Sequence, residues 1–300
     1  MANIELTDAD VAFYRENGYI VVPDVVSAED VARLRAVTDE LVEQSRQVRE
    51  NGDVYDLEDS HAPDRPRVRR IKTPHKWHEA YATLLRHPNI VAVLRRLIGP
   101  NIRFDTSKLN MKSEAGGAPV GWHQDWAFYP HTNDDLCATG LMLDDVGLDN
   151  GPMMVVPGSH RGPTYDHHVD GYFCGAINDN AAEAAYARAV PLTGTAGSLT
   201  VHHVRILHGS APNRSNRPRR FLLHQYRAAD AWPLLGFDDI GQYDDLMVAG
   251  ETTIAPRLVP TPVRLPLPPA PHQGSIYENQ RGLGGDIRIP DGEPKRAEAT

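Results

Sequence analysis

Cysteine is scarce in this sequence, and long apolar runs are absent. Two cysteines, Cys137 and Cys174, occur in 300 residues, which excludes a disulfide framework and a CxxC metal site and fits a reducing compartment. The longest apolar stretches, such as Tyr19 to Pro23, are far shorter than the roughly 20 residues of a membrane-spanning helix. The opening MANIELTDAD lacks the basic start and apolar core of a signal peptide. We therefore expect a cytoplasmic protein.

Positively charged residues are also fewer than negatively charged ones. The chain has 31 Lys and Arg against 40 Asp and Glu, a net charge of -9. Such a global field repels nucleic acids and anionic lipid surfaces. We therefore expect a small-molecule substrate and neither a nucleic-acid nor a membrane partner. With 41% apolar and 24% charged residues, the composition is that of a globular chain that can form one large domain.

The first hundred residues or so predict a mainly helical part. Thr7 with Asp10, and Ser27 with Asp30, have the spacing of helix N-caps. Between these two openings, the apolar run from Gly18 to Pro23 predicts a short strand. Further on, the sequence predicts a strand near Val68 to Lys72 and a helical pair over Trp77 to Ile98 that stops at Gly99-Pro100.

From about residue 101 to 230 the sequence pattern changes to short apolar runs separated by Gly, Pro, Asn and Asp. These runs predict strands over Arg103 to Met111, Gly121 to Trp126, Cys137 to Leu143, Met153 to Val156, Ser198 to His203 and Arg220 to Tyr226. Strands at this spacing without regular helices between them favour an antiparallel sandwich or barrel over a parallel sheet.

The C-terminal extension, about residues 251–300, is rich in proline. Its density excludes a helix and favours extended or polyproline II chain; the prolines are Pro256, Pro260, Pro262, Pro266, Pro268, Pro269 and Pro271. The extension is expected to pack loosely over the sheet or to be partly disordered. Covering an active site or forming a homodimer are the alternative roles.

The candidate chemistry centres on Trp122-His-Gln-Asp125-Trp. On a strand, His123 and Asp125 point to the same face, so an imidazole and a carboxylate can reach one metal ion. His208 lies about eighty residues downstream and completes a set of two His and one carboxylate, which suits Fe(II) oxygen chemistry. His202 or His203 is an alternative third ligand. An Arg eleven residues after His208, Arg219, is placed to bind a carboxylate in two-pronged fashion.

These residues resemble the phytanoyl-CoA dioxygenase family of Fe(II)- and 2-oxoglutarate-dependent oxygenases. Four segments match in order and with family-like spacing: Phe13-Tyr-Arg-Glu-Asn-Gly-Tyr-Ile-Val-Val-Pro23, Trp122-His-Gln-Asp125, Asp149-Asn-Gly-Pro-Met-Met-Val-Val-Pro-Gly-Ser-His160, and His208-Gly-Ser-Ala-Pro-Asn-Arg-Ser215 through Arg219. The resemblance implies a single oxygenase domain, residues 1–300, with a double-stranded β-helix (jelly-roll, cupin-like) core and flanking helices.

The resemblance also implies the site residues. His123, Asp125 and His208 would bind Fe(II), with no catalytic residue beyond this metal centre. Arg219 would bind the distal carboxylate of 2-oxoglutarate, and Ser210 and Lys72 are further cosubstrate candidates. The segment after the metal motif is either barrel-rim packing or a substrate wall, formed by Trp126, Phe128, Tyr129 and His131.

The implied reaction consumes O2 and 2-oxoglutarate, hydroxylates an unactivated C–H bond of a small organic substrate, and releases succinate and CO2. Related halogenases lack the carboxylate that Asp125 supplies here, so the resemblance favours a hydroxylase. It does not select among CoA esters, free acids and natural products. Two other functions compete: a cupin-like zinc hydrolase or isomerase, and a non-catalytic jelly-roll binding module. Arg219 distinguishes the oxygenase from the zinc hydrolase, because a hydrolase does not need an arginine that binds a carboxylate at this position.

Overall fold

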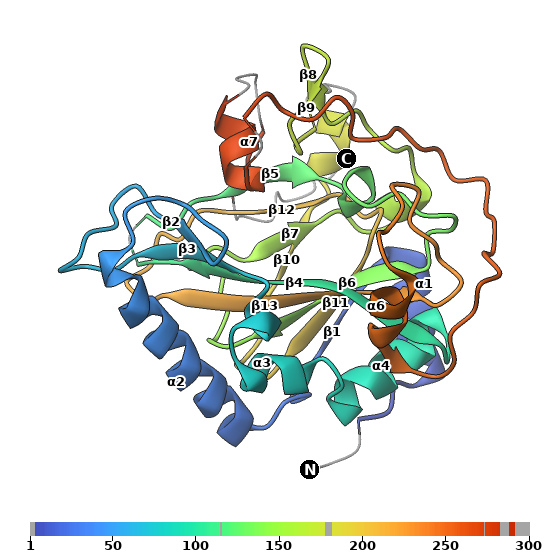
Figure 1. Ribbon diagram of the computed structural model, residues 1–300, viewed down its shortest axis with the longest axis horizontal. Helices are drawn as coiled ribbons and strands as arrows, with labels where there is room; N and C mark the ends of the chain where they lie inside the picture. Colours follow the sequence, from blue (N-terminus) through green and yellow to red (C-terminus); the bar gives the residue numbers. More distant parts are fainter. Residues whose placement is uncertain (1–3, 115, 178–181, 273, 283–287, 292–300) are drawn as a thin grey trace, which may run out of the picture.

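Two antiparallel sheets face each other in the computed structural model of the chain, and helices cover the outer face of the larger one (Figure 1). The structure describes residues 4–114, 116–177, 182–272, 274–282 and 288–291. The larger sheet has the strand order β1-β11-β6-β13-β4-β3-β2, with β14 paired to β4. Its strands are β1 (Tyr19–Val22), β2 (Tyr55–Leu57), β3 (Val68–Lys72), β4 (Ile102–Lys112), β6 (Leu136–Met142), β11 (Leu199–His203), β13 (Arg219–Ala228) and β14 (Met247–Ala249).

The smaller sheet has the order β10-β7-β12-β5 and lies over the inner face of the larger sheet (Figure 1). Its strands are β5 (Val120–His123), β7 (Met153–Val155), β10 (Val190–Leu192) and β12 (His208–Ser210), and a separate hairpin is formed by β8 (His168–Val169) and β9 (Tyr172–Phe173). Met142, Phe221 and Leu223 of the larger sheet pack against Met153 and Val155 of the smaller sheet. This apolar layer fixes the spacing between the sheets, and the site lies beside it.

The helices belong mostly to the N-terminal part. They are α1 (Asp8–Asn17), α2 (Ala28–Gln44), α3 (Glu79–Leu84), α4 (Pro88–Ile98), α5 (Glu183–Tyr186), α6 (Ile240–Asp245) and α7 (Ile276–Gly282). The side chains of Thr7 and Ser27 cap α1 and α2 as predicted, since each accepts the amide hydrogen three residues on. Apolar faces of α2, α3 and α4 share one buried cluster with the outward-facing residues of β4, β6, β11 and β13.

The predicted strands and the helical pair at 77–98 are confirmed to within a few residues at their ends. One expectation was wrong: the C-terminal extension contains a helix, α7. The helix begins at Ile276, after the last proline of the run, so no proline ring interrupts its backbone hydrogen bonds. Residues 283–287 and 292–300 of the extension lie outside the described part of the chain. None of the helices that the structure describes is long and apolar enough for a bilayer crossing.

Three buried histidines outside the site make the folding free energy depend on pH. Burial lowers the pKa of His131 to about 4 and the pKa of His167 and His224 to about 3. The unfolded chain takes up these protons near pH 6.5, roughly, and the folded chain does not, so stability falls as the pH drops below that value. We expect each ring to cost about 3 kcal/mol at about pH 4.

Urea unfolding midpoints of the metal-free protein measure this loss between about pH 7 and about pH 4. The His224→Gln variant should show a shallower decline, because one proton fewer is taken up on unfolding. A midpoint that does not change over this range would contradict the prediction.

Candidate metal centre and cosubstrate cavity

Antiparallel pairing of β5 and β12 brings the two candidate histidine ligands together. His123 is the last residue of β5 and His208 the first of β12, and the two are register partners. Their ring centroids lie 4.0 Å apart. The two histidines lie 85 positions apart in the sequence, and the pairing of β5 with β12 makes them neighbours.

Asp125 reaches the same point by a different route from the one predicted. The strand ends at His123, and Asp125 opens a 3-10 turn, η3 (Asp125–Ala127), so it is not a strand neighbour of His123. The turn directs the carboxylate back: Asp125 Oδ1 lies 3.8 Å from His123 Nε2, and Oδ2 lies 3.9 Å from His208 Nε2. One ligand atom from each of the three residues lies within 4.8 Å of the others.

Hydrogen bonds fix the ligand nitrogen of each histidine. His123 Nδ1 donates to the Gly121 carbonyl oxygen at 2.9 Å, and His208 Nδ1 donates to the Ile206 carbonyl oxygen at 3.0 Å. A carbonyl can only accept, so Nδ1 carries the proton and Nε2 keeps a lone pair for a metal.

The protonation states suit a cation as well. Burial lowers the pKa of His123 to about 4 and holds that of His208 well below its usual value, so both rings are neutral. Burial alone would raise the pKa of Asp125, but its neighbours, the Lys108 ammonium foremost, outweigh burial and hold the pKa well below the usual range. Two neutral imidazoles and one carboxylate on one side of an ion fit Fe(II) and leave positions open for further ligands.

The second His-x-Asp triplet of the sequence, His168-Val-Asp170, does not form such a site. His168 Nδ1 contacts the carboxylate of Asp166 at 2.8 Å. Among the described residues, His123, Asp125 and His208 are the one group with metal-binding geometry.

A cavity of about 480 Å³ opens beside the three ligands, between the two sheets. Its lining includes the three ligands and Arg70, Lys108, Asn110, Val120, Met153, His202, Gly209, Ser210, Arg219, Phe221, Leu223 and Ile276. The structure thus brings Ser210 and Arg219, two of the predicted cosubstrate residues, to the cavity that holds the predicted metal ligands. Ile276 comes from α7, so the C-terminal extension forms part of the wall.

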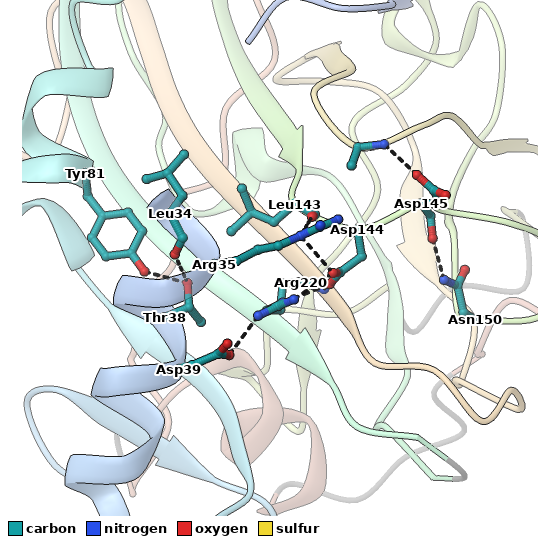
Figure 2. Close-up of polar contacts among 11 residues, drawn as sticks. Leu34, Arg35, Thr38, Asp39, Tyr81, Leu143, Asp144, Asp145, Asn150 and Arg220 are labelled. Atoms are coloured by element: carbon teal, nitrogen blue, oxygen red, sulfur yellow. Dashed lines mark hydrogen bonds and ion pairs between the residues drawn. The ribbon is translucent and has the colours of Figure 1, made fainter. Parts of the chain in front are cut away.

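Alternation along β13 separates Arg219 from its basic neighbours. Arg220 points to the outer face, where it forms ion pairs with Asp144 and Asp39 at 2.8 Å each (Figure 2). Arg217 lies before the strand and pairs with exposed Asp149 at 3.0 Å. Of these three arginines, Arg219 is the one that lines the cavity.

Arg219 is buried but has spare hydrogen-bonding capacity. Its Nη2 donates to the Gly151 carbonyl oxygen at 2.8 Å, whereas its buried Nε has no partner. No carboxylate of the described residues forms an ion pair with it. Burial lowers the pKa of Arg219 to about 10, so the guanidinium remains charged at neutral pH. A buried, unpaired guanidinium fits a ligand carboxylate.

Lys72, the third predicted cosubstrate residue, does not line the cavity. Its Nζ lies 2.8 Å from Asp56 Oδ1 and donates to the Gly52 carbonyl oxygen at 2.9 Å. Its register partner on the next strand is Lys108, which does line the cavity. Arg70 also lines it, with Nε at 3.8 Å from Asp56. Lys72 and Arg70 share this one carboxylate, so one positive charge remains between them.

The four residues predicted as barrel-rim packing or a substrate wall lie outside the cavity lining. Trp126 packs with Leu136 and donates its indole hydrogen to the Pro262 carbonyl oxygen. His131 Nδ1 donates to the Tyr129 carbonyl oxygen at 2.8 Å, which ties it into the turn. The rings of Phe128 and His123 pack edge to face, with 5.9 Å between their centroids. Phe128 therefore packs against a candidate metal ligand.

His202 and His203, the alternative third ligands, point to opposite faces of β11. His202 lines the cavity, with Nε2 at 3.5 Å from Asp125 Oδ2. His203 Nδ1 instead accepts the Arg205 amide hydrogen at 3.1 Å. Neither belongs to the group with metal-binding geometry.

Known proteins match the chain over most of its length. The sequence profile of the phytanoyl-CoA dioxygenase (PhyH) family matches residues 14–221. The "Probable alpha-ketoglutarate-dependent hypophosphite dioxygenase" of Stutzerimonas stutzeri is 43% identical over 274 residues, 90% of this chain and 96% of that protein. The "L-proline trans-4-hydroxylase" of Streptomyces griseoviridis is 32% identical over 248 residues, 76% of this chain and 88% of that protein.

A solved structure with the same fold contains the predicted cofactors. EctD from S. alaskensis with 2-oxoglutarate and 5-hydroxyectoine has a TM-score of 0.62 at 26% identity, covering 76% of this chain and 79% of that chain. The same protein with bound Fe has a TM-score of 0.63 at 25% identity, with coverage of 76% and 79%. The predicted jelly-roll core with flanking helices is thereby confirmed.

Proposed function

Because the chain belongs to the phytanoyl-CoA dioxygenase family, we propose that it is an Fe(II)- and 2-oxoglutarate-dependent dioxygenase that oxidises a small oxyanion, with hypophosphite as its substrate. The enzyme class predicted from the sequence is confirmed by the family and by the two relatives above. Both also favour an oxygenase over the zinc hydrolase and the binding module. The substrate and the residue roles are what the proposal adds.

The observation that carries the proposal is the charge of the cavity. Three cationic side chains, Arg70, Lys108 and Arg219, line it with one carboxylate, Asp125. Fe(II) and the 2-oxoglutarate dianion cancel each other in formal charge, so an excess of two positive charges remains. In a cavity of low dielectric constant this excess favours a second anion strongly over a neutral substrate.

The choice of a phosphorus oxyanion rests on the more similar of the two relatives above. The charge of the cavity supports a small anionic substrate. The 43% identical relative from Stutzerimonas stutzeri carries the name of a probable hypophosphite dioxygenase. The charge and this relative together support a P–H bond of a small phosphorus oxyanion in place of the C–H bond that the sequence predicts.

Each cavity residue has a role in the proposal. His123, Asp125 and His208 would hold Fe(II), which supplies the activation of O2 when bound. Arg219 and Ser210 would bind the distal carboxylate of 2-oxoglutarate, and Lys108 takes the place predicted for Lys72. Buried between two sheets, these groups keep water away from the reacting centre.

The overall reaction balances with the predicted cosubstrates. One oxygen atom of O2 enters succinate as 2-oxoglutarate loses CO2, and the other converts a P–H bond of hypophosphite to P–OH, which gives phosphite. The two electrons that reduce this second oxygen atom come from the P–H bond, and the other two come from 2-oxoglutarate. No further reductant is required.

The proposal is tested by incubating the purified protein with Fe(II), 2-oxoglutarate and hypophosphite. We expect succinate and phosphite in equal amounts, and a visible absorption band of the chelated 2-oxo acid under anaerobic conditions. The band without hypophosphite-dependent succinate would contradict the substrate, with proline as the comparison compound. Absence of both would contradict the cosubstrate assignment.

The proposal includes a small-molecule substrate as the partner and a cytoplasmic location. Cys137 and Cys174 are both buried and unpaired, which supports a reducing compartment. The homodimer stays a prediction.

A further inference from the structure

A row of three residues crosses the larger sheet beside the metal ligands. His202 on β11, Ala138 on β6 and Gln225 on β13 are register partners. Gln225 lies on the same face as Leu223, which lines the cavity, because residues two apart on a strand share a face. His202 Nε2 lies 3.5 Å from Asp125 Oδ2, so the row adjoins the metal centre.

The polar atoms of this row are buried and mostly without partners. His202 Nδ1 and Gln225 Nε2 have no hydrogen bond, and His202 Nε2 has the Asp125 carboxylate beside it at 3.5 Å. The two residues are only 1% and 4% exposed. Buried polar groups nearly always have a partner, so unpartnered nitrogens on two residues of one row indicate a ligand. Adjacent strands lie about 4.8 Å apart, so the two backbones are about 10 Å apart, and Ala138 between them carries only a methyl group.

The 2-oxoglutarate that Arg219 binds cannot occupy this position too. Gln225 is six residues from Arg219 along β13, which corresponds to about 20 Å of strand. Phe221 and Leu223 project into the cavity between the two. A five-carbon diacid is much shorter than this separation. The row is therefore left for the substrate.

Resting on the proposed function, we propose that His202 and Gln225 form the subsite that binds the oxygen atoms of the hypophosphite anion. Both offer N–H donors, which recognise oxygen and not the P–H hydrogens. When the two oxygen atoms of hypophosphite face His202 and Gln225, its P–H bonds face the metal ligands. Lys108, the register partner of Leu223 on β4, supplies charge beside the row. This pair would determine specificity by orienting the substrate.

The test compares KM for hypophosphite with KM for 2-oxoglutarate in the His202→Asn and Gln225→Met variants. Gln225→Met removes the amide donor with little change of volume, and His202→Asn keeps an N–H donor on a shorter side chain. We expect KM for hypophosphite to rise about 10- to 100-fold, the effect of one hydrogen bond to a charged group, and KM for 2-oxoglutarate to change less than about threefold. The His202→Leu variant, which has no donor, should lose more than His202→Asn.

Adjacent residues on the outer face of the same strands provide matched controls. His203→Gln and His224→Gln alter β11 and β13 without touching the cavity, and should leave both KM values unchanged. An anaerobic Fe(II) titration completes the set, because a loss of iron affinity in the His202 variants would show that His202 acts through Asp125.

The outcomes separate this inference from the proposed function. If the wild-type protein oxidises hypophosphite and the variants keep its KM, the subsite is wrong and the proposed function stands. Equal increases in both KM values, or loss of iron affinity, would also overturn the subsite. If the wild-type protein forms the 2-oxoglutarate complex but does not oxidise hypophosphite, the substrate and the subsite both fail.

Discussion

The Asp125→Ala variant is expected to lose turnover by more than about 1000-fold while it keeps its fold. Loss of a group that merely supports a metal ligand already costs about 10- to 100-fold, and Asp125 is the one carboxylate of the proposed ligand set. Without it, Fe(II) would have two neutral imidazoles next to the Lys108 ammonium, which repels a cation. Succinate formation and anaerobic Fe(II) binding measure the loss.

Stability should change far less than turnover in this variant. Among the described residues, the closest polar contact of the Asp125 carboxylate is His202 Nε2 at 3.5 Å, the long limit of a hydrogen bond, so its removal breaks few strong contacts in the metal-free protein. The control is Asp149→Ala, which removes a carboxylate with a side chain 58% exposed. Retained turnover in both Asp125→Ala and His123→Ala would contradict the ligand assignment.

The group with metal-binding geometry and the cavity position of Arg219 could be predicted from the sequence because each is marked by local chemistry. The His-x-Asp spacing holds whether the aspartate lies on a strand or in a turn, so the wrong strand end did not affect the ligand. Arg219 follows His208 at a distance set by one turn between two strands. The alternation of β13 then places Arg219 inside and Arg220 outside.

Lys72 could not be separated from Lys108 by sequence, because the difference depends on long-range pairing. The two are register partners on β3 and β4, and β3 lies farther from the centre of the sheet. There Lys72 meets Asp56 of β2. The sequence offers His202 and His203 as alternatives without showing which one points inward, and the row with Gln225 exists only through the order β11-β6-β13.

A signal for α7 was present in the sequence. Ser275 and Glu278 have the Ser-x-x-Glu spacing of a helix start, and the Ser275 amide donates to Glu278 Oε2 at 2.7 Å. The prolines nearby obscured this pattern. Tyr277 of α7 lies 5.1 Å from the guanidinium of Arg70, so the helix supports one of the cavity cations.

The Arg219→Ala variant is expected to raise KM for 2-oxoglutarate by about 100-fold or more. Loss of one partner from a buried, hydrogen-bonded charge pair costs about 2–5 kcal/mol, and each 1.4 kcal/mol, roughly, is a factor of ten. Arg70, the other guanidinium among the described lining residues, comes from β3, two strands away from Arg219 in the sheet. Arg219→Lys should recover part of the affinity, since it restores the charge but not the two-pronged geometry. Steady-state kinetics at saturating hypophosphite measure both.

The two arginines beside Arg219 make the assignment specific. Arg217→Ala removes a side chain 53% exposed and should leave both KM and stability unchanged. Arg220→Ala removes the closer of the two arginine partners of Asp144 and leaves it with Arg35 at 3.4 Å, so it should lower the urea midpoint and leave KM for 2-oxoglutarate unchanged. If KM for 2-oxoglutarate increased in Arg220→Ala but not in Arg219→Ala, the cosubstrate carboxylate would bind at the outer face of β13, and the assignment to Arg219 would be contradicted. Only the predicted pattern, affinity lost at Arg219 and stability lost at Arg220, is consistent with the alternation of the strand.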